Sequence, residues 1–269
     1  MHPGVISSPP GASVQQLAMT MLLHGIHAVV LGPPDQAEPL MVTDLRLLRT
    51  ALKRPDARAQ EIAAEPLASL PTDATLRQAV QVMAERYVAH VLATEPESGA
   101  PAGIVSTFDV AAVLAGHDPR YARLLRPAPA RPLVSAATLA QARAGEVMHA
   151  GITTCGADVP LQGVVRAMAE HRVHSVAVAG IDRHAHLTWG LITDLGLILA
   201  LHRGALEEQA GSIAATEPIA VQQHDTVDRV ASMMVEHDTT HLVVVDRAGL
   251  PAGIISSLDV VELLAGSGV

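Results

Sequence analysis

The sequence predicts an α+β fold built from four copies of one unit of about 60–70 residues. Two observations carry this prediction. An apolar stretch that ends in Ser or Thr occurs four times, at residues 40–43, 103–106, 190–193 and 253–256. Thr43 and Thr193 are 150 positions apart, and so are Ser106 and Ser256. The first unit therefore corresponds to the third and the second to the fourth, so the chain repeats as two copies of a pair.

An amphipathic helix is expected early in each unit. Apolar residues recur at i, i+3, i+4 and i+7, which places them in one stripe along a helix. The stripes are Val14, Leu17, Ala18 and Met21; Leu76, Ala79, Val80 and Met83; Leu161, Val164, Val165 and Met168; and Val227, Val230, Ala231 and Met234. Ser13 with Gln16, and Thr75 with Gln78, form capping-box signatures at the start of the first two helices. No single unit could bury its stripe alone.

Short apolar strands are expected after these helices, at residues 28–31, 91–93, 176–178 and 242–245. A loop and a second apolar strand lead to the Ser/Thr turn. A short helix follows the turn, for example at residues 110–115 and 260–265. Each unit is thus expected to run strand, helix, strand, loop, strand, turn, helix.

The turns of the second and fourth units resemble the signature of the CBS-domain (cystathionine-β-synthase domain) family, Gly-h-h-Thr/Ser-x-x-Asp, where h is apolar. The sequence reads Gly-Ile-Val-Ser-Thr-Phe-Asp at 103–109 and Gly-Ile-Ile-Ser-Ser-Leu-Asp at 253–259. The first and third units depart from it, because Arg46 and Gly196 stand at the Asp position. The resemblance covers nearly the whole chain. It implies a stand-alone protein whose four CBS repeats form two tandem Bateman modules, each a pair of repeats.

The expected domains are CBS repeats at residues 1–52, 60–116, 144–202 and 210–269, with a linker at 117–143 between the modules. The linker is rich in Pro and Arg, which favours a connection with a helical part near 136–143. A basic arm for an anionic ligand or partner is the alternative interpretation. Nothing outside the repeats is long enough for a catalytic domain, so any effector is expected to be a separate protein.

Composition narrows the function class. Aromatic residues make up 1% of the 269 residues, which disfavours base stacking on single-stranded nucleic acid. The net charge of −9 disfavours a DNA-binding surface. The sequence shows neither an apolar run of membrane-spanning length nor a signal peptide. Cys155 is the single cysteine, so no intrachain disulfide can form, and a cytoplasmic location is expected.

The turns of the second and fourth units are the predicted ligand sites. A turn at a helix N-terminus favours an anion, and a carboxylate nearby can accept hydrogen bonds from the two hydroxyls of a ribose. The resemblance implies that such positions bind AMP, ADP, ATP or S-adenosylmethionine. The residues that carry over are Ser106, Thr107 and Asp109, and Ser256, Ser257 and Asp259. The alternative is that these Ser and Asp residues only cap the short helix.

The base is expected to lie against aliphatic side chains and strand starts, at Ala89 and His90 and at Thr240 and His241. In the first and third units, His27 and His174 precede the second strand. The resemblance implies that they contact nucleotide phosphates, while the alternative is that they fill polar gaps. The turns that carry Thr43 and Arg46, or Thr193 and Gly196, would need another way to hold ribose.

No metal site and no required cofactor are expected. The chain has 14 His, and the spacings of His171 with His174 and of His184 with His186 favour surface histidines over a metal site. No general acid–base pair or phosphate-binding loop points to an enzyme. The leading hypothesis is a regulatory adenine-nucleotide sensor. A structural or dimerisation scaffold with vestigial sites is the alternative, and a DNA- or metal-linked regulator ranks last.

The helices after the turns are apolar on several sides and are expected to pack module against module. They would close a disc within one chain or pair two chains as a homodimer. The residues concerned are Val110, Val113, Leu114, Val260, Val261, Leu263 and Leu264.

Overall fold

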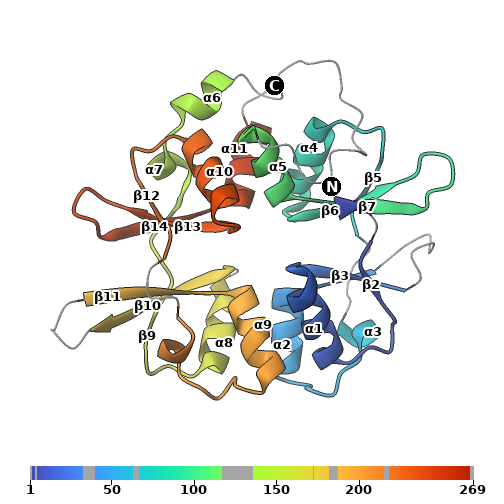
Figure 1. The fold of residues 1–269 in the computed structure, drawn as a ribbon, viewed down its shortest axis with the longest axis horizontal. Helices are drawn as coiled ribbons and strands as arrows, with labels where there is room; N and C mark the ends of the chain where they lie inside the picture. Colours follow the sequence, from blue (N-terminus) through green and yellow to red (C-terminus); the bar gives the residue numbers. More distant parts are fainter. Residues whose placement is uncertain are drawn as a thin grey trace. The chain divides into compact units, whose positions relative to one another are not determined.

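The computed structural model describes residues 2–3, 5–32, 40–62, 67–116, 136–171, 173–181, 187–214 and 218–266, and it shows the expected mixture of helices and strands in each of the four repeats (Figure 1). The first repeat contains β2 (Ser7–Ser8), α1 (Val14–His24), β3 (Ala28–Leu31), β4 (Leu40–Thr43) and α2 (Asp44–Ala51). The second contains β5 (Ser69–Pro71), α4 (Leu76–Arg86), β6 (His90–Thr94), β7 (Pro101–Ser106) and α5 (Thr107–Leu114). The third contains β9 (Thr154–Gly156), α8 (Leu161–His171), β10 (Ser175–Ile181), β11 (Leu187–Thr193) and α9 (Asp194–Arg203). The fourth contains β12 (Ala220–Gln222), α10 (Val227–Glu236), β13 (His241–Val245), β14 (Pro251–Ser256) and α11 (Ser257–Gly266).

The connecting segments carry short elements of their own. These are α3 (Ala59–Ile62), α6 (Ala136–Gln141), α7 (Ala144–Val147) and a 3-10 turn, η1 (Ala210–Ser212). Helix α6 falls within the predicted helical part of the linker, whose residues 117–135 lie outside the described part of the chain.

Each repeat contributes a small sheet with the same pairing. An antiparallel hairpin, such as β6 with β7, is flanked by a parallel strand, such as β5 on β6. Two sheets gain a fourth strand from another part of the chain. β1 (His2–Pro3) pairs with β7, and β8 (His149–Ala150) pairs with β14. His2 lies opposite Ile104 and His149 opposite Ile254, so these two added strands take equivalent registers.

The chain divides into two compact units. Each unit joins two repeats that are not consecutive in the sequence. The odd unit, Ile6–Pro66 with Ile152–Pro218, contains the first and third repeats. The even unit, Met1–Val5 with Leu67–Gly151 and Ile219–Val269, contains the second and fourth. In the odd unit α1 packs on α9 and α2 on α8, and in the even unit α5 packs on α10 and α4 on α11. In Figure 1 the helices of each unit lie side by side along its sheets.

The apolar stripes are buried between partner repeats. In the odd unit the fully buried side chains include Met21 and Leu47 of the first repeat and Met168 and Leu197 of the third, and all belong to one core. In the even unit Val110, Val260 and Val261 are buried in a second core that joins the second and fourth repeats. Of the seven helix residues expected to meet between modules, four are buried within the chain, Val110, Val260, Val261 and Leu264. The other three, Val113, Leu114 and Leu263, are half-buried.

Both predicted capping boxes are present. The Ser13 hydroxyl accepts the Gln16 N–H at 3.2 Å, and the Gln16 side chain accepts the Ser13 N–H at 2.8 Å. Thr75 and Gln78 form the same pair of bonds at the start of α4. These bonds satisfy donors that a helix leaves unpaired at its first turn.

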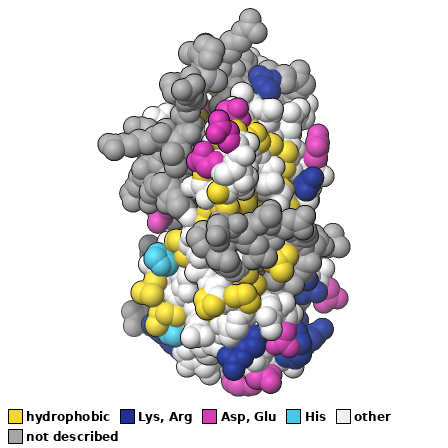
Figure 2. Space-filling model, turned by 90° about the vertical axis from the view of Figure 1, so that its right-hand side faces the viewer, with side chains coloured by type: hydrophobic (Ala, Val, Ile, Leu, Met, Phe, Trp, Pro, Cys, Tyr) yellow, Lys and Arg dark blue, Asp and Glu magenta, His cyan; other side chains and the backbone are white. Residues whose placement is uncertain are grey.

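The described helices lack the length and apolar character needed to cross a bilayer. The face shown in Figure 2 carries acidic, basic and hydrophobic side chains of the described residues. Arg54 and Glu61 form an exposed ion pair, with Nη1 and Oε1 3.4 Å apart. The described part of that face shows no continuous basic surface of the kind that binds a nucleic-acid backbone.

Candidate functional site

One backbone hydrogen bond fixes which residues are equivalent in the four repeats. In each repeat, the first N–H of the helix after the turn donates to the carbonyl of the residue directly before the second strand. The bonds are Asp44 to His27 at 2.9 Å, Thr107 to Ala89 at 3.0 Å, Asp194 to His174 at 3.2 Å and Ser257 to Thr240 at 2.9 Å. His27, Ala89, His174 and Thr240 therefore occupy equivalent positions in three dimensions.

In the second repeat the predicted Ser106 and Asp109 lie together at the start of α5. Asp109 Oδ2 accepts the Ser106 N–H at 2.8 Å and the Ser106 hydroxyl at 2.6 Å. The Asp109 N–H donates to the Ser106 hydroxyl oxygen at 3.2 Å. These bonds make a capping box, and Asp109 is buried. The carboxylate therefore caps the helix, as in the alternative interpretation, whatever else it binds.

The fourth repeat repeats this geometry and adds a histidine. Asp259 Oδ2 accepts the Ser256 N–H and the Ser256 hydroxyl, both at 2.6 Å. Asp259 Oδ1 lies 2.7 Å from Nδ1 of His149, which strand β8 brings to this turn. Burial raises the pKa of Asp259, although the bonds from Ser256 and the charge of His149 oppose that rise. His149 was not among the predicted site residues.

The predicted Thr107 and Ser257 meet each other. Their hydroxyl oxygens are 2.8 Å apart, and both residues are buried where α5 and α11 begin. Each hydroxyl thus has a partner in the opposite repeat. Both residues were predicted to contact a ligand, and their contact with each other was not predicted.

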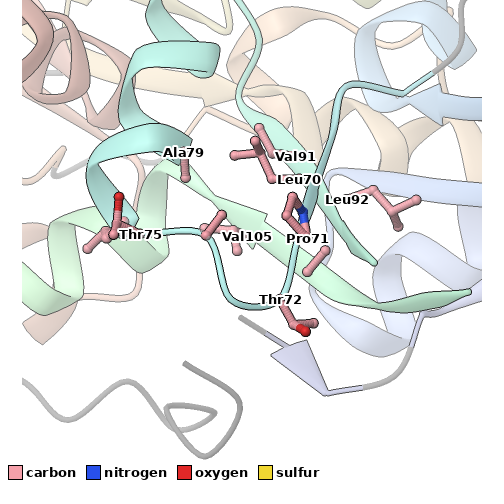
Figure 3. Close-up of a pocket in the computed structure, with 11 residues that line it drawn as sticks. Leu70, Pro71, Thr72, Thr75, Ala79, Val91, Leu92 and Val105 are labelled. Atoms are coloured by element: carbon pink, nitrogen blue, oxygen red, sulfur yellow. The ribbon is translucent and has the colours of Figure 1, made fainter. Parts of the chain in front are cut away.

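The strand starts predicted to hold the base are half-buried. Ala89, His90, Thr240 and His241 all have this intermediate exposure. The Thr240 hydroxyl lies 2.9 Å from Nδ1 of His241. The cavity beside β6, lined in part by Leu70 and Val91, measures only about 20 Å³ (Figure 3). That volume is about the size of one water molecule and far below that of a base, so the base is not held in this cavity.

The first and third repeats carry no carboxylate at the equivalent turn position. The Arg46 Nε donates to the carbonyl of Ile62 at 2.7 Å, which ties the guanidinium to α3. In the third repeat the Gly196 N–H donates to the Thr193 hydroxyl at 3.4 Å. This turn therefore keeps half of a capping box.

Replacing Gly196 with Asp is expected to complete that box. A Cβ at Gly196 would meet its nearest neighbour, the Thr193 hydroxyl, at 3.7 Å, which is ordinary contact. The loss of glycine flexibility and the added carboxylate should stabilise the protein by about 1 kcal/mol. Chemical denaturation of Gly196→Asp measures this, with Gly196→Ala separating the glycine effect from the carboxylate. A Gly196→Asp variant no more stable than Gly196→Ala would show that no box forms.

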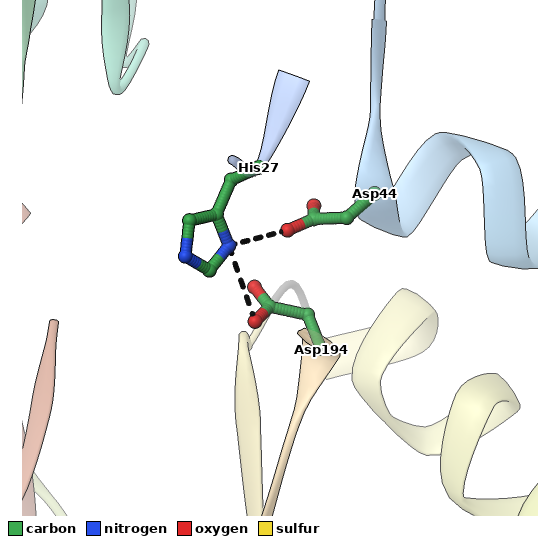
Figure 4. A group of neighbouring side chains, drawn as sticks. All are labelled: His27, Asp44 and Asp194. Atoms are coloured by element: carbon green, nitrogen blue, oxygen red, sulfur yellow. Dashed lines mark hydrogen bonds and ion pairs between the residues drawn. The ribbon is translucent and has the colours of Figure 1, made fainter. Parts of the chain in front are cut away.

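The odd unit instead gathers a buried cluster of His and Asp (Figure 4). His27 Nδ1 lies 2.7 Å from Asp44 Oδ2 and 3.4 Å from Asp194 Oδ1. His174 Nδ1 lies 3.0 Å from Asp194 Oδ2. Both carboxylates are 2% exposed, and each accepts the N–H of the next residue, Leu45 or Leu195. We call these four side chains, His27, Asp44, His174 and Asp194, the His–Asp cluster.

The charges of the His–Asp cluster depend on one another. Burial lowers the pKa of His27, but the hydrogen bonds and charges of Asp194 and Asp44 outweigh it and raise that pKa to about 11. Burial raises the pKa of Asp44 to about 6, and the neighbouring charge of Asp194 adds to the rise. The hydrogen bond to Asp194 raises the pKa of His174. His27 is therefore a cation held between two buried carboxylates, and only Nε2 of His27 remains to meet a predicted phosphate.

The sequence contains a signal for this cluster that was not among the predictions. Asp44 and Asp194 each follow the Thr of the turn, and they are 150 positions apart. The Asp position of the family signature falls two residues later, on Arg46 and Gly196, so the signature does not point to Asp44 or Asp194. Of the histidines weighed as metal ligands, His171 is exposed, and His184 and His186 lie outside the described residues.

Comparison with known proteins finds the CBS-domain model at residues 59–116, 144–203 and 210–266. These ranges contain the second, third and fourth repeats. Among curated proteins, Hypoxic response protein 1 of Mycobacterium tuberculosis is 24% identical over 124 residues, 45% of this chain and 84% of that protein.

Two solved structures align over almost the whole chain. Protein MJ1225 from Methanocaldococcus jannaschii matches with a TM-score of 0.75 at 15% identity, covering 97% of this chain and 96% of that one. An uncharacterized conserved protein from Pyrococcus horikoshii matches with a TM-score of 0.61 at 15% identity, covering 98% and 97%. At these identities the likeness concerns the fold.

Proposed function

Because the chain belongs to the CBS-domain family, we propose that it is a cytoplasmic, non-enzymatic regulatory protein that binds adenine nucleotides of the AMP, ADP and ATP class. The binding turns are those of the second and fourth repeats. One observation carries this proposal: Ser106 with Asp109, and Ser256 with Asp259, form the same carboxylate-bearing turn twice. The first and third repeats have Arg46 and Gly196 in place of that carboxylate.

The chemistry of these turns suits a ribose. A carboxylate can accept hydrogen bonds at both of its oxygens, so it can receive the two adjacent hydroxyls of a ribose. At Asp259 the second oxygen faces His149, whose side chain is 64% exposed and so has room to shift when a ribose enters.

The remaining ligand contacts follow from the same proposal. Thr107 and Ser257 satisfy each other, so the phosphate contacts fall to backbone N–H groups at the helix starts and to Ser106 and Ser256. The two Ser hydroxyls would exchange their bonds to Asp109 and Asp259 for bonds to the phosphate. His27 and His174 stay predicted phosphate contacts through Nε2. S-adenosylmethionine, which also carries an adenosine, is the alternative ligand. Nucleotide binding would shift an equilibrium between two conformations of the chain, and a separate effector protein would respond to that shift. The size of the shift is set by the difference between the nucleotide affinities of the two conformations.

Calorimetry on conservative variants tests the proposal. Asp109→Asn with Asp259→Asn keeps an oxygen for the capping box but removes the charge that strengthens the ribose bonds. We expect AMP and ATP affinity to fall by about 10- to 150-fold, corresponding to roughly 1.5–3 kcal/mol. The wild type should also prefer AMP to 2′-deoxy-AMP. The matched control is Glu146→Gln, because Glu146 caps α7 in the same way by accepting the Arg143 N–H at 2.9 Å.

A scaffold is the second candidate, and the capping bonds of Asp109 and Asp259 favour it. In that case the carboxylates would serve only helix stability, and the chain would act through dimerisation. A double variant that binds AMP, ATP and S-adenosylmethionine as tightly as the wild type would remove the two turns from the binding site. A wild type that binds none of the three would favour the scaffold.

A further inference from the structure

We propose that His27, Asp44 and Asp194 form a binding site for a divalent first-row transition metal ion, with Zn²⁺ the best match, inside the odd unit. One atom from each residue faces the others, and the three atoms lie within 4.8 Å of one another. Figure 4 shows the imidazole of His27 pointing between the two carboxylates. All three residues belong to the odd unit, whereas the carboxylates proposed to bind ribose, Asp109 and Asp259, belong to the even unit.

The separations suit a small tetrahedral ion. Ligands about 2.0 Å from Zn²⁺ lie about 3.3 Å from one another in a tetrahedron. His27 Nδ1 and Asp194 Oδ1 are 3.4 Å apart, which already matches that spacing. His27 Nδ1 and Asp44 Oδ2 are 2.7 Å apart and need to open by a few tenths of an ångström. Imidazole with two carboxylates is a donor set used by zinc and its first-row neighbours.

The even unit shows that the fold does not need charges at this position. Thr107 and Ser257 are the equivalents of Asp44 and Asp194, and their hydroxyls satisfy each other at 2.8 Å. A neutral pair therefore closes the same junction between two repeats. Burying two carboxylates there costs desolvation that a structural role would not require. The His–Asp cluster thus calls for a role beyond joining the repeats.

The surroundings also fit a metal site. His174 holds Asp194 through Oδ2, and the N–H groups of Leu45 and Leu195 hold the two carboxylates. Such outer bonds orient the ligands of protein metal sites. The His27 side chain is 27% exposed, which leaves a path for the ion and for a water as fourth ligand. The ion takes the place of the proton on Nδ1 of His27, so that proton is released on binding.

The even unit supplies the test variant. This variant carries four substitutions, Asp44→Thr, Asp194→Ser, His27→Ala and His174→Thr. They copy, in that order, the residues of the even unit at Thr107, Ser257, Ala89 and Thr240. The metal-free full chain is titrated with Zn²⁺ against a chromophoric chelator, and Co²⁺ reports tetrahedral coordination in its visible spectrum. We expect one tight site per chain in the wild type and a loss of affinity of about 100-fold or more in the copied variant.

Two further variants keep the outcome decisive. Asp194→Asn is nearly isosteric and should also lose the site, which covers the case in which the fourfold variant fails to fold. His184→Ala with His186→Ala should bind as the wild type does. The proposal would be overturned if Asp194→Asn bound Zn²⁺ as the wild type does. It would also be overturned if replacing His184 and His186 abolished Zn²⁺ binding. So would a wild type that takes up no Zn²⁺. AMP titration of Asp194→Asn, which keeps both His27 and His174, reports separately on the nucleotide turns.

Discussion

His27→Ala should destabilise the metal-free protein by about 3–5 kcal/mol, because it leaves two buried carboxylates without the cation between them. Asp44 and Asp194 are each 2% exposed, so water cannot take over the role of the imidazole. His174 also hydrogen-bonds Asp194, at 3.0 Å, whereas His27 is the histidine that hydrogen-bonds Asp44, so Asp44 is the carboxylate most affected. Urea denaturation in the presence of a chelator measures the loss.

The fourfold variant that copies the even unit is the matched control for this prediction. It removes the carboxylates together with the histidines, and its free energy of unfolding should stay within about 1 kcal/mol of the wild type, since replacing a whole buried ion pair is often neutral. If His27→Ala were as stable as the wild type, the imidazole would not be the cation that balances this cluster.

Met21→Ala should destabilise the protein by about 2–5 kcal/mol, the usual cost of a cavity left by a large core side chain. Met21 is fully buried in α1, within the core that the first and third repeats share. The same helix offers a control, because Met19 is 40% exposed. Met19→Ala should change stability by less than about 0.5 kcal/mol. Thermal and urea denaturation measure both variants. Equal losses of stability in Met21→Ala and Met19→Ala would contradict the assigned core face of α1.

Local structure could be predicted from the sequence because its signals are local. The stripe from Leu76 to Met83 and the Thr75 cap locate α4, and the structure begins that helix at Leu76. The apolar run at Ala28–Leu31 is strand β3 with the same bounds. Helix α5 begins at Thr107, three residues before the predicted start at Val110, because Ser106 caps it. A hydrophobic pattern marks the buried part of a helix, whereas the cap sets its first residue.

The partners of the site residues could not be predicted in the same way. The 150-residue repeat shows that Thr107 and Ser257 are equivalent, but equivalence does not tell which residues touch. Their hydrogen bond depends on α5 and α11 packing against each other, a contact between distant parts of the sequence. His149 reaches Asp259 for a related reason. The two-residue strand β8 is too short to be read from a pattern, and its place beside β14 is set by tertiary pairing.

The most direct test of the proposed function is a crystal structure of the full chain grown with AMP. The account predicts nucleotide density at the turns of the second and fourth repeats, with the ribose hydroxyls within hydrogen-bond distance of the Asp109 and Asp259 carboxylates. It also predicts that the turns carrying Arg46 and Gly196 bind AMP more weakly or not at all. AMP bound only at those two turns, or a ribose that avoids both carboxylates, would contradict the account.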